Sequence, residues 1–393
     1  MNKIYEKESY VDSINTVVTE SGQDEKGYYI CLDETIFFPE EGGQYADTGS
    51  LEYNGITVRL LDGQISGGNI KYYTSELIPK DTLVLCKLDW KLRYDRMQNH
   101  SGEHILTGVI HNKYGFNNVG FHLSDDGFVT LNLDGVLTYE QVIEMEKSAN
   151  EVIYKNMPIT DTYPTKDELK NIEYRSKIEI EGQVRLITVG DGKETVDVCA
   201  CCAPHVKRTG EIGIIKVISV INFKGGIQIS MLCGRRALEY INVEHEILMK
   251  TARSLSTAIT EVPVMVNAHK EELTELRLML NREKENAAIR DTESDDFERF
   301  SVIFASGDFP KGSMKNVYNV MCDKKDGYVG FFVGSDSEGY QYNAGIKDGD
   351  SRELAKLLRE ELGAKGGGSP EMIQGRLNVS KSKIESFFER INS

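Results

Sequence analysis

The stretch MQNHSGEHILTGVI, from Met97 to Ile110, places His100 and His104 four residues apart. The chain has only seven histidines, so a pair at this spacing stands out. Residues i and i+4 of a helix lie on one face, where two imidazoles can bind the same metal ion. Two histidines alone are more often ordinary surface or core residues. A metal site therefore needs further ligands from elsewhere in the chain.

A distant segment, DVCACCAPHVKRTGEIG, offers those ligands. Cys201 and His205 are four residues apart there, in a loop interrupted by proline and glycine. Thiolate and imidazole ligands suit zinc better than magnesium or calcium. We therefore predict a tetrahedral Zn²⁺ site formed by His100, His104, Cys201 and His205. Cys199 and Cys202 are interpreted as small neighbours of the site rather than ligands.

Glu103 allows a second interpretation of the histidine pair. His-Ser-Gly-Glu-His fits the H-x-x-E-H pattern of inverted zinc metallopeptidases, in which the glutamate is the general base. That class uses a downstream glutamate as its third ligand, whereas Cys201 and His205 are the best downstream partners here. The peptidase hypothesis stays open on these residues, in second place.

Composition limits the class of protein. Hydrophobic residues make up 40% and charged residues 27% of 393 residues, which is typical of a globular chain with two or three domains. A net charge of −16 argues against nonspecific coating of nucleic acid. We expect a cytoplasmic protein with no membrane partner, because no apolar run or signal-peptide pattern is present. Seven cysteines, three of them at 199–202, indicate metal or thiol chemistry rather than disulfides.

The sequence pattern predicts an α+β fold in which two domains surround the metal motifs. Residues 1–88 alternate β-rich runs with turn signals at Asn54-Gly55 and Asp62-Gly63, which predicts a small β-barrel. Residues 89–245 mix helices and strands and form the predicted zinc-containing domain. One helix there should bury a stripe made of Val142, Met145, Ala149, Val152 and Ile153.

Two further segments follow. Residues 246–293 are predicted to be a helical connector, broken near Pro263. Val266, Leu273, Leu280 and Ala287 repeat every seven residues along it, a weak coiled-coil signal that allows a homodimer contact. Residues 294–393 read as strand, helix, strand, strand, helix and then a glycine-rich run, which predicts a small α/β domain.

Five motifs, in order along the chain, resemble one known family. RMQNHSGEHIL and CCAPHVKRTGEIG resemble the zinc motifs of the alanyl-tRNA synthetase editing domain and of the free-standing AlaX-type editing proteins. FFPEEGGQYADTGSL is similar to the family's barrel motif, and VGFHLSDDGFVTLNLD to the strand after the zinc helix. AKGGGSPEMIQGRL is similar to the glycine-rich signature of the synthetase's C-terminal domain, the DHH-associated type. The resemblance covers nearly the whole chain.

The resemblance implies a trans-editing hydrolase that deacylates mischarged tRNA(Ala) without ATP. Seryl-tRNA(Ala) would be the main substrate and glycyl-tRNA(Ala) a possible second one. Fewer than forty residues precede the barrel motif, so we expect no aminoacylation core, as in the long AlaX form. The alternative from another class is a zinc-containing tRNA-binding module without hydrolysis.

The remaining candidate residues surround the zinc motifs or lie in the glycine-rich run. Glu103, His122 and Ser124 are candidates for catalysis; strand alternation would place the last two on one face, toward the pocket. The resemblance implies substrate contact by Gly42, Gly43 and Gln44, and Thr209 is a further candidate for positioning substrate. Glycines let backbone N–H groups approach an anion, so the run Gly366, Gly367 and Gly368 could hold a phosphate. The resemblance implies tRNA contact by this domain, and loop flexibility is the alternative. With four protein ligands, zinc is predicted to anchor the substrate rather than activate water.

Overall fold

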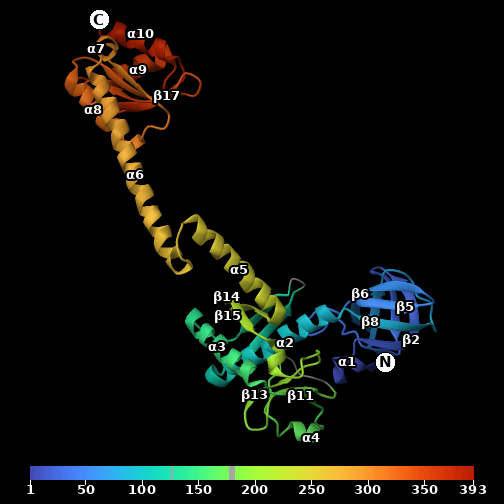
Figure 1. The fold of residues 1–393 in the computed structure, drawn as a ribbon. Helices are drawn as coiled ribbons and strands as arrows, with labels where there is room; N and C mark the ends of the chain where they lie inside the picture. The colour runs from blue at the N-terminus through green and yellow to red at the C-terminus, as the bar shows by residue number, and fades with distance from the viewer. Residues whose placement is uncertain (125–126, 177–181) are drawn as a thin grey trace. The chain divides into compact units, whose positions relative to one another are not determined.

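The computed structural model describes residues 1–124, 127–176 and 182–393 (Figure 1). The chain forms two compact units, Met1–Leu248 and Met249–Ser393, and helix α5 (Gly234–Ser254) crosses the boundary between them. The fold is mixed α+β, as predicted. Within the described ranges, no helix combines the length and apolar character needed to cross a membrane.

Unit 1 begins with a closed barrel, as the sequence predicted. A short helix, α1 (Ile4–Lys7), and the paired strands β1 (Asn2–Lys3) and β4 (Glu34–Thr35) accompany it. The barrel strands, in spatial order, are β2 (Ser13–Asp24), β3 (Gly27–Leu32), β7 (Asn69–Thr74), β6 (Ile56–Ser66), β5 (Gly49–Tyr53) and β8 (Leu83–Leu88). Apolar side chains from alternate positions of these strands fill the interior.

One of the two predicted hairpin turns is confirmed and the other is wrong. Asn54 and Gly55 join β5 to β6 with φ angles of 47° and 80°, the left-handed conformation that such a turn requires. Asp62-Gly63 instead lies inside β6, next to a register shift in the pairing with β7. The turn falls at Gly67-Gly68, with φ angles of 59° and 83°, because two glycines reach this conformation at no steric cost.

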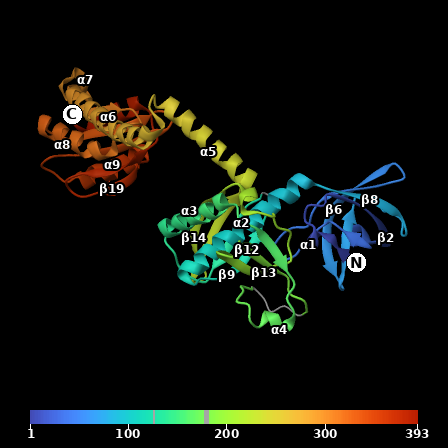
Figure 2. The ribbon, with the colours of Figure 1, turned by 60° about the horizontal axis from the view of Figure 1, so that its bottom comes forward.

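Helix α2 (Trp90–Tyr114) carries the histidine pair and leads from the barrel into the rest of unit 1 (Figure 2). Asp89 starts it by accepting a hydrogen bond from the Leu92 amide, and Gly115 ends it at a φ of 74°. Every residue from 95 to 108 is buried, so the helix is covered on all its faces. Polar side chains on α2 must therefore find partners inside the protein.

Two sheets and one long helix surround α2. Helix α3 (Tyr139–Lys155) starts with a capping box at Thr138 and buries its predicted apolar stripe against α2. The first sheet has the order β14 (Ile215–Phe223), β15 (Gly226–Cys233), β10 (Val129–Leu133) and β9 (Asn118–Leu123). The second has the order β11 (Ile159–Thr162), β12 (Leu186–Gly190) and β13 (Thr195–Ala200). Short helices α4 (Lys166–Leu169) and η1 (Thr209–Ile212) complete this part.

Unit 2 begins with a helix and continues into one sheet. Helix α6 (Val262–Arg290) has Pro263 in its first turn, after the 3₁₀ turn Ile259–Glu261, which confirms the predicted break. The sheet has the order β16 (Val302–Ala305), β17 (Val329–Ser335), β18 (Gly339–Gly345), β20 (Ile373–Leu377) and β19 (Lys365–Gly368). Helices α7 (Asp295–Phe300), α8 (Met314–Lys324), α9 (Ser351–Leu362) and α10 (Lys381–Ile391) complete the unit.

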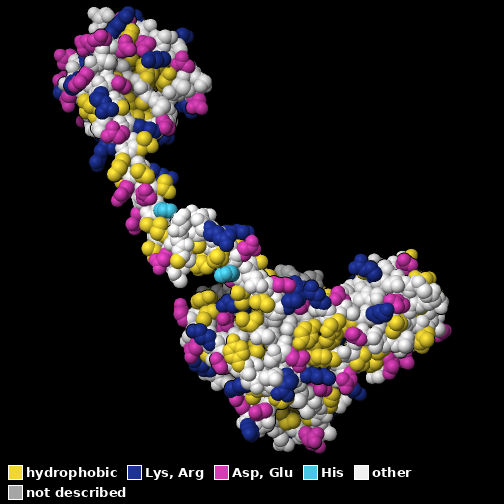
Figure 3. Space-filling model, viewed as in Figure 1, with side chains coloured by type: hydrophobic (Ala, Val, Ile, Leu, Met, Phe, Trp, Pro, Cys, Tyr) yellow, Lys and Arg dark blue, Asp and Glu magenta, His cyan; other side chains and the backbone are white. Residues whose placement is uncertain are grey.

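Along α6, hydrophobic side chains stand among the charged ones on the surface (Figure 3). The predicted heptad positions Val266, Leu273 and Leu280 are each about half exposed within unit 2. Their exposure agrees with the heptad pattern, while a homodimer contact through this helix stays a prediction.

Candidate metal centre

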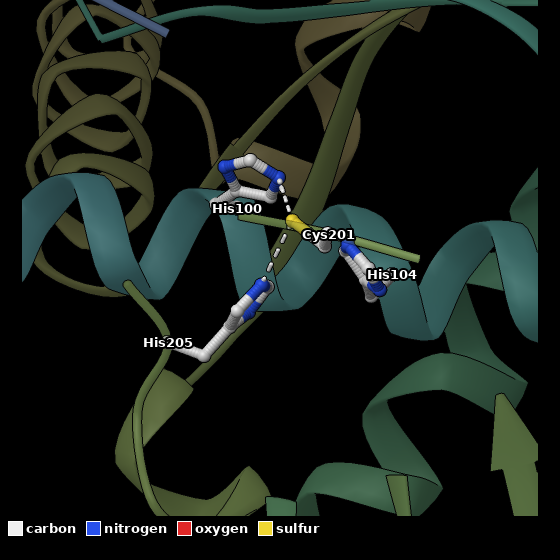
Figure 4. A group of neighbouring side chains, drawn as sticks. All are labelled: His100, His104, Cys201 and His205. Atoms are coloured by element: carbon white, nitrogen blue, oxygen red, sulfur yellow. Dashed lines mark hydrogen bonds between the residues drawn. The ribbon is translucent and has the colours of Figure 1, made fainter. Parts of the chain in front are cut away.

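The four predicted metal ligands lie together in unit 1 (Figure 4). His100 and His104 come from α2, and Cys201 and His205 come from the loop after β13. The Cys201 Sγ atom lies 3.5 Å from His100 Nε2 and 3.4 Å from His205 Nε2. One nitrogen of each imidazole and this sulfur all lie within 4.8 Å of one another. The three histidines are buried and the cysteine is half-buried.

These distances fit a tetrahedral metal ion. Zinc bonds of about 2.3 Å to sulfur and about 2.0–2.1 Å to nitrogen, at tetrahedral angles, separate the two ligand atoms by about 3.6 Å. The sulfur–nitrogen distances of 3.5 and 3.4 Å come close to that separation without any rearrangement of the backbone. Three imidazoles and one thiolate also favour zinc over magnesium or calcium, which prefer oxygen ligands.

The Nδ1 atom of each imidazole forms a hydrogen bond on the side of the ring away from Cys201. The partners are Gln44 Oε1 at 2.8 Å for His100, Asp197 Oδ2 at 3.0 Å for His104 and Ser101 Oγ at 3.0 Å for His205. These contacts leave Nε2 of each ring directed toward the cysteine, as metal-binding histidines require. Gln44 was predicted as a wall of the substrate pocket, whereas Ser101 and Asp197 were not predicted at all.

The surrounding charges favour a thiolate at Cys201. Burial alone would raise the pKa of this thiol, but the imidazoles of His100 and His205 lower it well below its ordinary value. Burial lowers the pKa of His205 to about 3, although the neighbouring sulfur opposes this. A thiolate beside a neutral imidazole is the combination that binds a transition metal.

Asp197 connects His104 to a second charged partner. Arg175 Nε donates to Asp197 Oδ1 at 2.8 Å, so the buried carboxylate lies between a guanidinium and an imidazole. Burial would raise the pKa of Asp197, but His104 and Arg175 keep it below its usual value. The carboxylate therefore stays ionised and can hold His104 in one orientation.

His104, Asp197 and Cys199 form a second group whose ligand atoms lie close enough together to bind a metal ion. Burial raises the pKa of Cys199 to about 11, which favours the neutral thiol. Cys201, not Cys199, is therefore the better ligand.

Glu103 is buried, and its carboxylate forms hydrogen bonds with other residues of unit 1. Its Oε1 atom accepts hydrogen bonds from Thr107 Oγ1 and Asn118 Nδ2, and its Oε2 lies 4.0 Å from His104 Nε2. These partners fix α2 to the start of β9, so a structural role accounts for the carboxylate. A catalytic role for Glu103 stays a prediction.

Strand β9 presents a different residue to the cluster than expected. The Phe121 ring lies 4.6 Å from the His100 ring, whereas His122 is exposed and packs 5.5 Å from Tyr45. Ser124 Oγ donates to the Phe128 carbonyl at 3.0 Å. The expected phase of the strand was thus wrong by one position, because successive side chains point to opposite faces.

The glycine pair of the barrel motif positions Gln44. Gly42 and Gly43 have φ angles of 62° and 84°, and a Cβ on Gly43 would stand 2.3 Å from the Phe121 carbonyl oxygen. The Leu123 amide donates to the Gly43 carbonyl at 2.8 Å. Only glycine allows the turn to approach β9 this closely, and the approach brings Gln44 to His100.

Two other predicted groups lie away from the cluster. The Thr209 hydroxyl donates to the Val152 carbonyl and accepts from the Met157 amide, so it joins η1 to the end of α3. Gly366, Gly367 and Gly368 form β19, at the edge of the sheet in unit 2. Any contact of these residues with substrate stays a prediction.

Two arginines before the histidine pair on α2, Arg93 and Arg96, are buried. Arg93 is fully buried, and its guanidinium donates to Asp47 and to the Ile36 carbonyl. Arg96 is also buried and donates to the Ala46 carbonyl. Both join α2 to the segment between β4 and β5 and are not available on the surface to bind nucleic acid.

The chain matches one known domain family and is similar to several individual proteins. Residues 184–228, which include Cys201 and His205, match the threonyl and alanyl tRNA synthetase second additional domain. The chain is 28% identical to the alanyl-tRNA editing protein AlaX-L of Pyrococcus horikoshii, over 98% of this chain and 96% of the relative. An alanyl-tRNA editing protein of Xenopus laevis is 27% identical over 91% of this chain and 87% of its own.

Larger relatives contain the same region. The alanine–tRNA ligase of Caldivirga maquilingensis is 30% identical over 90% of this chain. The matched region makes up 40% of the ligase. The similarity to alanyl-tRNA editing proteins over nearly the full length confirms the resemblance that the motifs indicated.

Proposed function

We propose that this protein is a zinc-dependent hydrolase that removes wrong amino acids from tRNA(Ala) in trans. Seryl-tRNA(Ala) is the expected main substrate and glycyl-tRNA(Ala) the second. The observation that carries the proposal is the His₃Cys cluster, each imidazole of which has its own Nδ1 partner, in a chain similar over 98% of its length to an alanyl-tRNA editing protein.

His100, His104, Cys201 and His205 would hold the Zn²⁺, which supplies a fixed positive charge beside the substrate when bound. The reaction breaks the ester bond between the acyl carbon and the ribose oxygen, and water supplies the new oxygen. Gln44 and Phe121 both contact His100 and would orient the acyl group there. A site that hydrogen-bonds the serine hydroxyl rejects alanine, because alanine leaves its polar groups without partners.

The RNA part of the substrate would extend to other regions of the chain. Gly366, Gly367 and Gly368 have no side chains to keep a phosphate away from their backbone, which supports tRNA contact at β19. The exposed heptad residues of α6 support a homodimer contact through this helix.

A zinc-containing tRNA-binding module without hydrolysis is the second candidate. The observation in its favour is that four protein side chains can fill a tetrahedral shell, which is typical of structural zinc sites. The inverted metallopeptidase is less well supported, because Cys201 and His205, rather than a downstream glutamate, complete the cluster, and Thr107 and Asn118 bond to one carboxylate oxygen of Glu103.

The test measures zinc content and hydrolysis on one purified sample. One zinc per chain, together with release of serine from seryl-tRNA(Ala) and no release of alanine from alanyl-tRNA(Ala), is the expected result. Bound zinc without hydrolysis of any mischarged tRNA(Ala) would favour the binding module. Cleavage of peptides would favour the metallopeptidase.

A further inference from the structure

The turn from Glu41 to Gln44 carries two polar side-chain atoms without partners. Glu41 Oε2 and Gln44 Nε2 are both buried, and neither has a hydrogen-bond partner among the described residues. The backbones of the two residues pair directly, with both N···O distances at 3.1 Å. Residues paired in this way project their side chains to the same side. An acceptor, Glu41 Oε2, and a donor, Gln44 Nε2, therefore lie on the same side of the turn.

The turn lies beside the metal cluster. Gln44 Oε1 contacts His100 Nδ1 at 2.8 Å, which leaves the amide Nε2 as its second polar atom. Phe38, three residues before Glu41, packs in a buried cluster with Ala203, and the side chains of Cys201 and Cys202 pack against this cluster. The turn therefore lies against the metal ligands on both the α2 side and the loop side.

Tyr5 adds a third polar atom at the same place. Its ring is fully buried and packs with Phe38 and Ala203, and its hydroxyl also has no partner among the described residues. Cys201 and Cys202 pack against the same buried cluster, so this hydroxyl lies near the loop that carries the metal ligands. A tyrosine hydroxyl and a carboxylate both offer acceptor oxygens to an incoming donor group.

Buried polar atoms without partners are costly, so this group of atoms indicates a ligand with complementary chemistry. A carboxylate needs a cation or a strong donor. An α-ammonium group provides one positive charge and three N–H donors, and the adjacent acyl carbonyl provides an acceptor for an amide N–H. An amino acid attached through its carboxyl group matches the pattern.

We propose that Glu41 binds the α-ammonium group of the aminoacyl ester, with the Tyr5 hydroxyl as a second acceptor. This rests on the proposed function and narrows its substrate class. The protein would act on esters of free amino acids and would discriminate against N-acylated ones, such as peptidyl-tRNA. A translating ribosome's peptidyl-tRNA carries no α-ammonium group at the ester-linked residue, so it would be spared.

The experiment compares free and blocked amino groups in wild type and two variants. Glu41→Gln removes the charge, and Glu40→Gln is the matched control, because Glu40 is exposed and bonded to Gln64. Hydrolysis of seryl-tRNA(Ala) and N-acetylseryl-tRNA(Ala) is measured for each. Wild type and Glu40→Gln should prefer the free amine by on the order of 10- to 100-fold in kcat/KM, as one charge-assisted hydrogen bond allows. Glu41→Gln should lose this preference and keep its zinc.

A binding measurement on wild-type protein keeps the test decisive if Glu41→Gln fails to fold. The probes are adenosine derivatives with serine or 3-hydroxypropionate joined through a non-hydrolysable amide at the 3′ position. Tighter binding of the serine derivative supports the assignment. Equal binding of the two, or full amine preference in a folded Glu41→Gln protein, overturns it. Wild type that binds the serine derivative preferentially but hydrolyses no aminoacyl-tRNA would overturn only the proposed function.

Discussion

The His/Cys cluster of unit 1 and the glycine-rich strand of unit 2 come from equally distinct sequence motifs, but they are not equally informative. The cluster consists of side chains whose donor atoms, spacing and partners restrict the ligand to a tetrahedral transition metal. Strand β19 offers only backbone groups, and these pair with β20 from Lys365 to Gly368. Side chains with known donor atoms and geometry identify the ligand they bind. Glycines show only how closely a ligand can approach the backbone.

The largest expected effect is the loss of a metal ligand. Cys201→Ala and His100→Ala should each lose zinc and deacylation together, because three protein ligands remain for a buried tetrahedral ion. Metal analysis and seryl-tRNA(Ala) hydrolysis provide the two measurements. The activity loss should exceed the roughly 10–100-fold typical of residues that only orient a ligand.

Cys199→Ser is the control for this prediction, since Cys199 lies beside the cluster with its pKa raised to about 11. It should keep both zinc and activity. If Cys199 proved to be the essential thiol instead, the assignment of the metal to Cys201 would be wrong.

The next effect concerns Asp197. Asp197→Asn removes the charge that holds His104 through Nδ1, and zinc affinity should fall about 10–100-fold. Competition with a chromophoric chelator measures the affinity, and the absorption spectrum of the Co²⁺-substituted protein should change as His104 reorients. Asp191→Asn, on the exposed turn between β12 and β13, is the matched control. Equal zinc affinities of the two variants would remove Asp197 from the site.

Glu103 should matter less than these residues, although it lies closest to the histidine pair in sequence. Its carboxylate accepts from Thr107 and Asn118, contacts that a glutamine oxygen can keep in part. Glu103→Gln should therefore reduce deacylation about tenfold or less, whereas removal of a general base costs ~10²–10⁴-fold. Near-complete loss with zinc retained would instead mean that Glu103 activates water.

The sequence predicts the metal ligands better than the residues that form hydrogen bonds with those ligands. The barrel, the histidine helix and the convergence of His100, His104, Cys201 and His205 follow from periodicity, turn signals and ligand spacing. The Nδ1 partners do not, because they lie 56, 93 and 104 residues from their histidines. Contacts of that kind are set by packing between elements. Ser101 and Asp197 lie within the two metal motifs, but the motifs do not tell which histidine each residue contacts.

The error in the face of β9 has the same origin. The face of β9 was assigned from local alternation, whereas the docking of the Gly42-Gly43 turn turns Phe121 toward His100. Thr209 follows the cysteine loop closely in sequence, and its hydroxyl bonds to the end of α3, while its contact with substrate stays a prediction. Proximity along the chain suggests candidate residues, but tertiary contacts determine where each side chain lies.

The smallest expected effect tests whether the glycine-rich strand binds tRNA. A Cβ at Gly367 would meet nothing within 4 Å, whereas one at Gly366 would stand 2.2 Å from the Gln374 carbonyl oxygen. Gly366→Ala should therefore destabilise unit 2 by about 1–3 kcal/mol, and Gly367→Ala should leave its thermal unfolding nearly unchanged. If phosphate approaches the backbone here, Gly367→Ala should weaken tRNA(Ala) binding about 2- to 10-fold, the value of one hydrogen bond. Turnover at saturating substrate should stay the same, since the metal ligands are all in unit 1. Unchanged tRNA affinity in a stable Gly367→Ala protein would leave β19 with a structural role only.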